Sequence, residues 1–455
     1  MLANKTYLSI PVLASALMLS GCMPLKNPNK GLEAPEASVW QNTPLEAGSI
    51  TGLENWWLHF EDPALEALVA QAMMDSPTLA IATARVEEAR GSKRTSLGGL
   101  LPNISGTGTA IESDEGATNQ RGSFEAGFDA SWEIDLWGKN RNAYTASAKS
   151  FKAREAQYQQ SKIVLISEIA RTYTALRAAE RQVELTQRNI KTLEETKRII
   201  EAQKRVGEAG RLDVERTDNL LNSTRAQVPE AERIREAQRL ALSVLVGVLP
   251  ENLDDMIMID GSIPSADHVP LLESPSDVLK RRPDVRAAQL EFAAATDLSE
   301  SAFANIFPSL TLGGFFGIAE GLAFDPTEIW RLSASSSLRL LDFGRLRGQI
   351  DAARARERIA FETYRGTILE AVADVETALS DYAHLKREEQ ALAAALVNAK
   401  SALKLSKKLY KEGEIAFLDV LDSERTAISA DRAHVDAQSQ VTQALIRLYK
   451  SLGAM

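Results

Sequence analysis

The sequence predicts a mainly α-helical protein with transmembrane β-strands, built from one unit that occurs twice. Three observations lead to this fold class. Residues 139–206 contain neither glycine nor proline, every even position over 124–136 is apolar, and matching residues recur 206 positions apart. These patterns indicate a long helix, a strand with one apolar face and an internal repeat. We therefore expect each unit to contain a short helix, a β-hairpin, a helix of about 68 residues and a returning helix.

Composition excludes several classes of function. The chain has 455 residues and a formal charge of −10, and this acidic balance argues against a nucleic-acid binder. One cysteine and four scattered histidines exclude a disulfide framework and give metal chemistry little to work with. The sequence shows no nucleophile with a base, no phosphate loop and no paired-histidine motif. We therefore expect no enzyme activity, no metal, no cofactor and no nucleic-acid partner.

The N-terminus resembles a bacterial lipoprotein signal. An apolar stretch over residues 7–20 is too short to span a bilayer as a helix and is typical of a secretory signal. It ends in Leu-Ser-Gly-Cys, which resembles the lipobox, so we expect a signal peptide over 1–21 and lipid on Cys22. Residues 22–61 would then form a lipidated N-terminal segment. Met23 stands where an aspartate would favour inner-membrane retention, which suggests outer-membrane sorting. The alternative is an idle cysteine in a peptide cut elsewhere.

The internal repeat organises the rest of the chain. The offset of 206 relates, without a gap, Pro77 to Pro283, Pro102 to Pro308, Gly138 to Gly344, Gly207 to Gly413 and Gly247 to Gly453. One offset held across so many turn residues indicates a gene duplication. We expect the repeats at 62–249 and 276–455, each opening with helices, and a proline-rich linker over 250–275.

Each repeat should hold a β-hairpin. The expected strands are at about 103–111 and 123–136 in the first repeat, and at about 309–317 and 329–341 in the second. Their period-two alternation predicts one apolar face and one wet face. At about 3.3 Å per residue the second strand of each hairpin reaches roughly 40 Å, enough to cross a hydrocarbon core at a tilt. The polar residues Glu125, Asp129 and Glu133 should then face a lumen.

A long helix should follow each hairpin, over 139–206 and over 345–412. At about 1.5 Å per residue each would be roughly 100 Å long. A heptad pattern that includes Leu165, Ile169 and Leu176 predicts packing against other long helices. Helices should return over 212–248, with a bend or restart at Pro229, and over 418–452.

A single copy of these elements is incomplete. Four strands with an apolar face cannot close a barrel, and open strand edges are not tolerated in lipid, so the chain must oligomerise. Two copies would supply eight strands and three would supply twelve, and closure alone does not fix the number. A rival hypothesis is a lipid-anchored periplasmic coiled-coil scaffold or adaptor without a pore. An adaptor, however, would carry one helical hairpin, whereas two are expected here.

Several motifs together resemble the TolC-type outer membrane factors, specifically their NodT-like lipoprotein branch. Besides the lipobox they are Trp56, Trp57, Phe60, Asp62, Pro63 and Leu65, the turn Asp342-Phe343-Gly344-Arg345, and the segments 207–214 and 413–422. The resemblance implies a homotrimer with a 12-stranded β-barrel in the cell outer membrane and a 12-helix tunnel in the periplasm. It also implies the exit duct of a tripartite efflux or secretion system, with a periplasmic adaptor and an inner-membrane pump as partners.

The resemblance also assigns roles at the turns between long and returning helices. Asp419 and Asp422 match acidic rings that narrow the periplasmic entrance, although Asp419 could instead cap the returning helix. Tyr410 and Asp213 match residues that hold the tips together when the channel is closed. Ile415 stands where some relatives carry a basic latch residue, which leaves the way the entrance is latched open.

Three glycines complete the predicted site. Gly207, Gly210 and Gly413 should permit tight turns between helices, and the resemblance makes them candidates for docking the adaptor. The sequence names neither the exported compound nor the class of pump, because a duct of this kind has little substrate pocket.

Overall fold

The computed structural model describes residues 39–41, 53–114, 120–257, 262–265, 270, 274–320 and 327–454. Cys22, the expected signal peptide and most of the expected lipidated segment lie outside these residues. No helix within the described ranges is long and apolar enough to cross a membrane.

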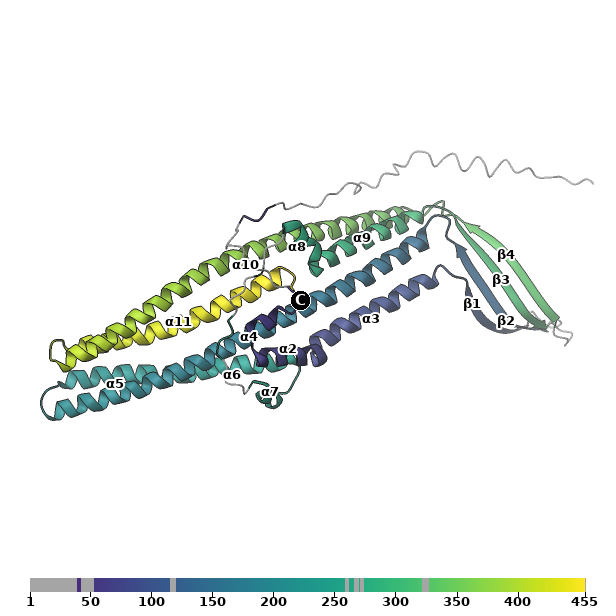
Figure 1. Ribbon diagram of the computed structural model, residues 1–455. Helices are drawn as coiled ribbons and strands as arrows, with labels where there is room; N and C mark the ends of the chain where they lie inside the picture. Colours follow the sequence, from purple (N-terminus) through teal and green to yellow (C-terminus); the bar gives the residue numbers. More distant parts are fainter. Residues whose placement is uncertain are drawn as a thin grey trace, which may run out of the picture. The chain divides into compact units, whose positions relative to one another are not determined.

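The two halves contain matching elements in the same order, except that the first half begins with η1 and has two returning helices where the second has one (Figure 1). The first half has η1 (Trp56–Phe60), α2 (Pro63–Asp75), α3 (Pro77–Gly98), β1 (Asn103–Asp114), β2 (Gln120–Ile134), α4 (Lys139–Arg205), α5 (Arg211–Arg225) and α6 (Gln227–Val246). The second has α8 (Pro275–Arg281), α9 (Pro283–Ala304), β3 (Ser309–Glu320), β4 (Thr327–Ser337), α10 (Arg345–Lys411) and α11 (Phe417–Ser451). Pro77 and Pro283 each stand in the first turn of a restarted helix, as expected, because proline lacks the N–H that this turn leaves unbonded.

One expectation about boundaries is confirmed and another needs correction. The first returning helix restarts near Pro229, as expected, because Ala226 separates α5 from α6 and Pro229 lies in the first turn of α6. The linker expected over 250–275 begins with a helix, α7 (Pro250–Ile257). Pro250 can begin this helix, because a backbone N–H in the first turn of a helix has no partner within the helix and proline loses nothing by lacking it.

The four strands form one antiparallel sheet in the order β1-β2-β3-β4. All four strands extend beyond the expected ranges at the hairpin ends, and β2 ends at Ile134, two residues before the expected end at 136. The expectation that the last strand runs to 341 is wrong for the single chain, since β4 ends at Ser337. Ser337 pairs with Ser309, and the residue before Ser309 is a proline, which has no N–H with which to continue the ladder.

One face of the sheet is apolar and open. Phe128, Phe316 and Trp330 lie opposite one another on three neighbouring strands, and their side chains are 64%, 60% and 77% exposed. Exposed apolar patches of this kind on soluble proteins are rare unless they meet a partner or a membrane. The sheet therefore has the wet and apolar faces that the alternation predicts.

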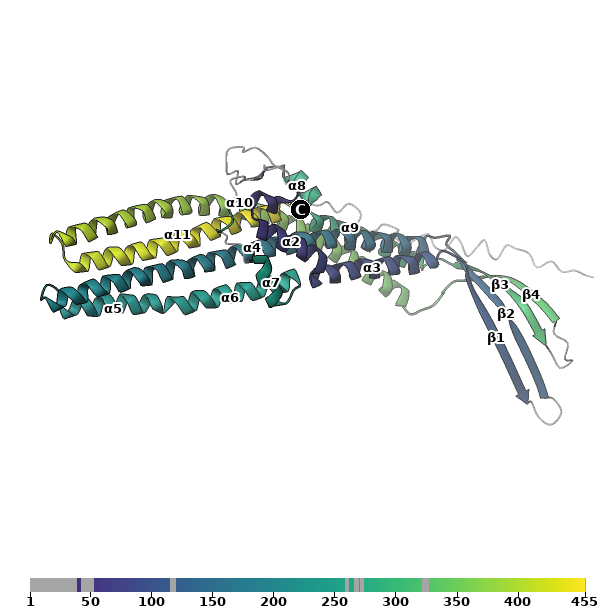
Figure 2. The same cartoon turned by 60° about the horizontal axis from the view of Figure 1, so that its bottom comes forward.

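The helices extend from the sheet in a layer. Next to the strands, α3 contacts α4, α4 contacts α9, and α9 contacts α10 (Figures 1 and 2). Toward the other end the returning helices α5 and α6 lie along α4, and α11 lies along α10. The turns between long and returning helices, which we call the tips, thus lie at the end of each long helix opposite the sheet.

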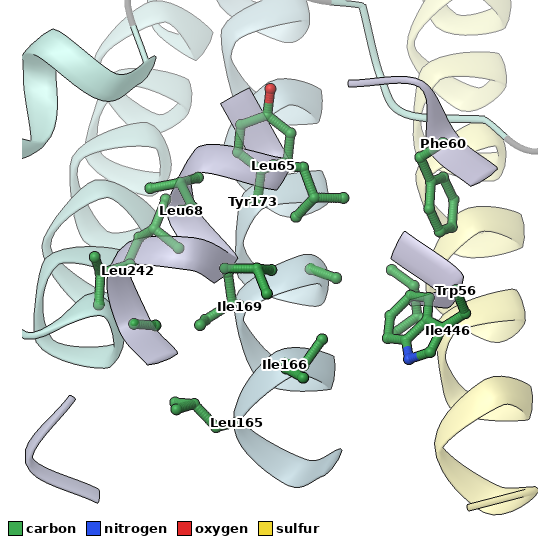
Figure 3. Packing of buried hydrophobic residues seen from close by; sticks show 14 of the residues in the cluster. Trp56, Phe60, Leu65, Leu68, Leu165, Ile166, Ile169, Tyr173, Leu242 and Ile446 are labelled. Atoms are coloured by element: carbon green, nitrogen blue, oxygen red, sulfur yellow. The ribbon is translucent and has the colours of Figure 1, made fainter. Parts of the chain in front are cut away.

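The largest apolar core lies about midway along α4, where α2, α6 and α11 pack against it (Figure 3). Leu65, Ile169 and Leu242 come from three of these helices and are fully buried. The heptad residues Leu165, Ile169 and Leu176 are all in this core, so the predicted seam does pack against other helices. Asp62 caps α2 and accepts a 2.8 Å hydrogen bond from Tyr173, which ties the short N-terminal helix to α4.

Candidate functional site at the helix tips

The first tip is a tight turn fixed by backbone geometry. Gly207 lies just after α4 and has a φ of 85°. This left-handed conformation is unfavourable for any residue that has a Cβ atom. The N–H of Gly207 donates to the carbonyl of Lys204 at 3.2 Å, and the N–H of Glu208 donates to the carbonyl of Gln203 at 2.9 Å. These two bonds satisfy carbonyls that the end of a helix leaves open.

The second tip repeats the same geometry. Gly413 has φ of 78°, and its N–H donates to the carbonyl of Tyr410 at 3.0 Å. The N–H of Glu414 donates to the carbonyl of Leu409 at 3.0 Å. Glycine at this position ends the long helix with a sharp reversal at both tips, as the sequence predicts.

Gly210 does not have the conformation that we expected. Its φ of −86° and ψ of 161° are extended, and the equivalent Ala416 has nearly the same angles, −76° and 154°. A Cβ atom on Gly210 would meet the Asp213 side chain at 3.5 Å, an ordinary contact distance. The prediction that Gly210 is needed for a tight turn is therefore wrong, because any residue adopts these angles.

Two aspartates cap the returning helices. The Asp213 carboxylate accepts a 3.1 Å hydrogen bond from the N–H of Gly210, and the Asp419 carboxylate accepts one of the same length from the N–H of Ala416. Both aspartates are the third residue of their helix, where a carboxylate satisfies an open backbone donor and favours the positive end of the helix dipole. The capping role that we left open for Asp419 is thus present in the chain.

Asp422 lies one turn further along α11 and does not cap the helix. Its carboxylate pairs with Arg425 at 2.6 Å, and both side chains are well exposed, at 60% and 72%. An exposed pair of this kind contributes little to stability. The Asp422 carboxylate is therefore accessible to solvent.

Tyr410 joins the two tips within one chain. Its hydroxyl donates a 2.9 Å hydrogen bond to the side-chain carbonyl of Gln203 near the end of α4. Burial raises the pKa of the Tyr410 hydroxyl, and the charge of Asp213 raises this pKa further. The hydroxyl thus stays neutral and able to donate. Asp213 contributes to the field at Tyr410, but the hydrogen-bond partner is Gln203.

An apolar cluster supports this contact. Ile200 of α4 packs with Phe417, Val420 and Leu421 of α11, and Tyr410 and Ile415 lie against the cluster. Ile415, at the position of the expected latch residue, is half buried there. An isoleucine at this position adds apolar contact between the hairpins in place of an ion pair.

Sequence reasoning missed two polar residues near the tips. Gln203 carries no motif, and its role appears only when α4 and α10 are placed together. Glu424 is a carboxylate with 2% of its side chain exposed, and one oxygen is 3.0 Å from the Lys407 ammonium. Its other oxygen has no hydrogen-bond partner among the described residues. Glu424 is four residues from Val420 and three from Leu421, and this helical spacing from two apolar residues was a signal that could have found it.

The wet face of the sheet carries charges of both signs. Glu125 forms an ion pair with Arg331, whose guanidinium carbon lies 4.5 Å from the centre of the Phe315 ring. Asp129 accepts a 2.8 Å hydrogen bond from Thr107. Charges of both signs meet within this face, so it does not present a single-sign filter.

This combination defines a class of protein. The layer of long helices ends in paired tips on one side. On the other side it continues into a sheet with one wet face and one open apolar face. This arrangement is the wall of a membrane channel. The position of the capped tips, far from the sheet, separates a membrane part from a part outside it.

Comparisons with known proteins identify the family. The family described as outer membrane efflux protein matches residues 68–248 and again 274–454. The chain is 30% identical to the pyoverdine export outer membrane protein OpmQ of Pseudomonas aeruginosa, over 98% of this chain and 96% of that protein. It is 27% identical to nodulation protein T of Rhizobium leguminosarum bv. trifolii, over 90% of each chain.

A solved structure agrees with these relatives. The outer-membrane channel OprN superposes with a TM-score of 0.87 at 28% identity, over 93% of this chain and 98% of that one. The chain belongs to the outer membrane efflux protein family. It is an outer-membrane channel component that extends into the periplasm, as we expected.

Proposed function

We propose that three copies of the chain form the exit duct of a tripartite efflux or secretion system. In this proposal twelve strands close a barrel in the outer membrane, and the helices continue it as a tunnel through the periplasm. The observation that most supports this proposal is the four-stranded sheet, in which β1 and β4 each pair on one side only among the described residues. Unpaired strand edges are not tolerated in lipid, so copies must close the ring.

A duplicated unit supports this assembly. The two stretches matched by the same family are displaced by 206 residues at both ends, the offset found in the sequence. Both tips also share their glycine conformation and their capping aspartate. A duplicated subunit makes a trimer nearly six-fold symmetric, which suits a cylinder closed by equivalent contacts.

The tips form the periplasmic entrance in this proposal. Three copies of Asp419 and Asp422 would bring like charges close together and favour cations or bridging counter-ions there. Tyr410 and Asp213 would take part in tip closure, with Gln203 as the partner of Tyr410. The tips at Gly207, Gly210 and Gly413 would receive the adaptor, which connects the duct to an inner-membrane pump.

Lipid on Cys22 would anchor the assembled duct to the outer membrane, as in the NodT-like branch. Cys22→Ser should leave a folded protein that no longer incorporates labelled fatty acid. Continued labelling of the variant would contradict the assignment of Cys22.

The test of the whole proposal is migration on gels together with co-purification. The unheated protein should migrate as a trimer that heating converts to a monomer, and it should co-purify with a periplasmic adaptor and an inner-membrane pump. A monomer without conductance would instead favour the rival hypothesis of a lipid-anchored scaffold or adaptor without a pore.

A further inference from the structure

The wet face of the sheet is poor in basic residues. Apart from Arg121, near the turn of the first hairpin, Arg331 is the only basic residue in the four strands. The wet face of β2 alone carries three acidic residues, Glu125, Asp129 and Glu133. A wall with this composition attracts cations, and the position of Arg331 decides how far that attraction is offset.

The Arg331 side chain reaches across a neighbouring strand. Arg331 lies on β4 and forms an ion pair with Glu125 on β2, and β3 lies between these two strands (Figure 1). The guanidinium donates hydrogen bonds to both oxygens of the carboxylate, one of them at 3.3 Å. Two parallel bonds of this kind fix the orientation of a guanidinium relative to its partner. The side chain therefore lies across β3.

Phe315 of β3 lies beneath this guanidinium. On the wet face it is paired with Asp129 on one side and with Arg331 on the other. The centre of its ring is 4.5 Å from the guanidinium carbon, and only 7% of the residue is exposed. The negative face of an aromatic ring attracts a cation at this distance. A phenylalanine at a wet-face position thus gives the guanidinium a surface on which to lie.

Two glycines leave the space that the ring occupies. Gly127 of β2 pairs with Gly317 of β3. A Cβ atom on Gly127 would be 2.7 Å from the Cζ atom of Phe315, and a Cβ atom on Gly317 would be 2.8 Å from it. Any other residue at either position would therefore push the ring, and the guanidinium above it, away from the sheet. The backbone, the ring and the guanidinium form successive layers on the wet face.

Glu125 and Arg331 occupy equivalent positions of the two repeats. They are 206 residues apart, which is the offset of the duplication. One repeat supplies the acid and the other supplies the base, so the ion pair closes within a single chain. The two charges offset each other at this level of the sheet.

We propose that Phe315 and Glu125 are positioning residues that hold the Arg331 guanidinium against the wall of the duct, and that this placement sets the charge selectivity of the lumen. The inference rests on the proposed duct, in which the wet face lines the lumen. A released guanidinium would extend on its long side chain toward the axis and attract anions, whereas the shorter Glu125 would stay near the wall. Three copies would bring three such cations to one level of the lumen.

Variants that keep the net charge test this inference. Arg331→Lys keeps the positive charge but replaces the planar guanidinium with a flexible ammonium group. Phe315→Leu keeps an apolar side chain and removes the ring. Phe316→Leu is the matched control, because Phe316 is the next residue on β3 and is exposed on the opposite face. The purified full-length proteins are recorded in planar bilayers under a roughly tenfold gradient of KCl below about 0.1 M, where surface charges are least screened.

Arg331→Lys and Phe315→Leu should each raise the permeability of chloride relative to potassium by about twofold or more, as measured by the reversal potential. Phe316→Leu should keep the wild-type ratio. Wild-type ratios in the first two variants, or an equal shift in Phe316→Leu, would overturn the inference while the duct itself stands. A wild-type protein that gives no conductance steps would instead contradict the proposed function.

Chemical modification of Arg331 provides a second measurement that does not depend on conductance. Phenylglyoxal reacts with accessible guanidinium groups, and mass spectrometry of the digested protein gives the rate at Arg331. Phe315→Leu and Glu125→Gln each remove one of the groups that hold the guanidinium, so the rate should rise by about threefold or more. Phe316→Leu should react at the wild-type rate. Equal rates in all four proteins would contradict the positioning role.

Discussion

Tyr410 donates a 2.9 Å hydrogen bond to Gln203, and this bond joins the end of α10 to the end of α4 in one chain. The two tips are therefore linked by a neutral bond and by the apolar cluster around Ile200 and Phe417. A neutral link of this kind depends little on salt, in contrast to an exposed ion pair. In the proposed function, this contact within the chain would hold the entrance closed.

Loss of the hydroxyl or of its acceptor should loosen the tips. Tyr410→Phe and Gln203→Leu each remove one neutral hydrogen bond, which is typically worth about 1 kcal/mol, or roughly fivefold in an opening equilibrium. Single-channel recordings should show a larger open fraction for both variants. Gln187→Leu, on an exposed part of α4, is the control and should behave as the wild type. Wild-type recordings from both tip variants would contradict this role.

The same bond predicts a response to alkaline pH. Because the pKa of Tyr410 is raised, its neutral form is favoured in the folded tip; the stabilisation is complete below the ordinary tyrosine pKa of about 10 and is lost as pH rises through the folded-state value. The open fraction should therefore be constant from about pH 6 to 9 and should rise only above about pH 10. Tyr410→Phe should lack this alkaline rise, and an identical rise in that variant would assign it to another group.

The two tip glycines that we compare should differ in their tolerance of a Cβ atom. Gly413→Ala forces alanine into a left-handed conformation, at a cost of about 1–2 kcal/mol. Gly210→Ala should be tolerated, because Ala416 already has the same angles at the equivalent position. Hydrogen exchange at the tips should be faster in Gly413→Ala and unchanged in Gly210→Ala. Equal exchange in both variants would refute the backbone argument.

Variants of the two aspartates of α11 should distinguish the effect of the helix cap from the effect of the charge at the entrance. Asp419→Ala removes a cap and should destabilise the start of α11 by about 1 kcal/mol, whereas Asp422→Ala removes only an exposed ion pair. Both variants should reduce block by multivalent cations, and the double variant should also raise conductance. Unchanged block and conductance in the double variant would rule out the entrance role.

The sequence predicts the elements well where one chain suffices to determine them. The long helices follow from stretches without glycine or proline, and the tips follow from Gly207 and Gly413. It fails where the outcome depends on what lies opposite: Ser337 ends β4 because its partner strand begins at Ser309. Gln203 could not be identified, since a glutamine on a helix has no local signature, and Gly210 was misjudged because glycine also occurs at extended positions.

The most direct test of the central claim is single-channel conductance of the purified full-length protein in planar bilayers. A trimeric duct with a barrel closed by twelve strands should insert and give discrete, stable conductance steps. A protein that stays monomeric and gives no steps under the same conditions would contradict the account.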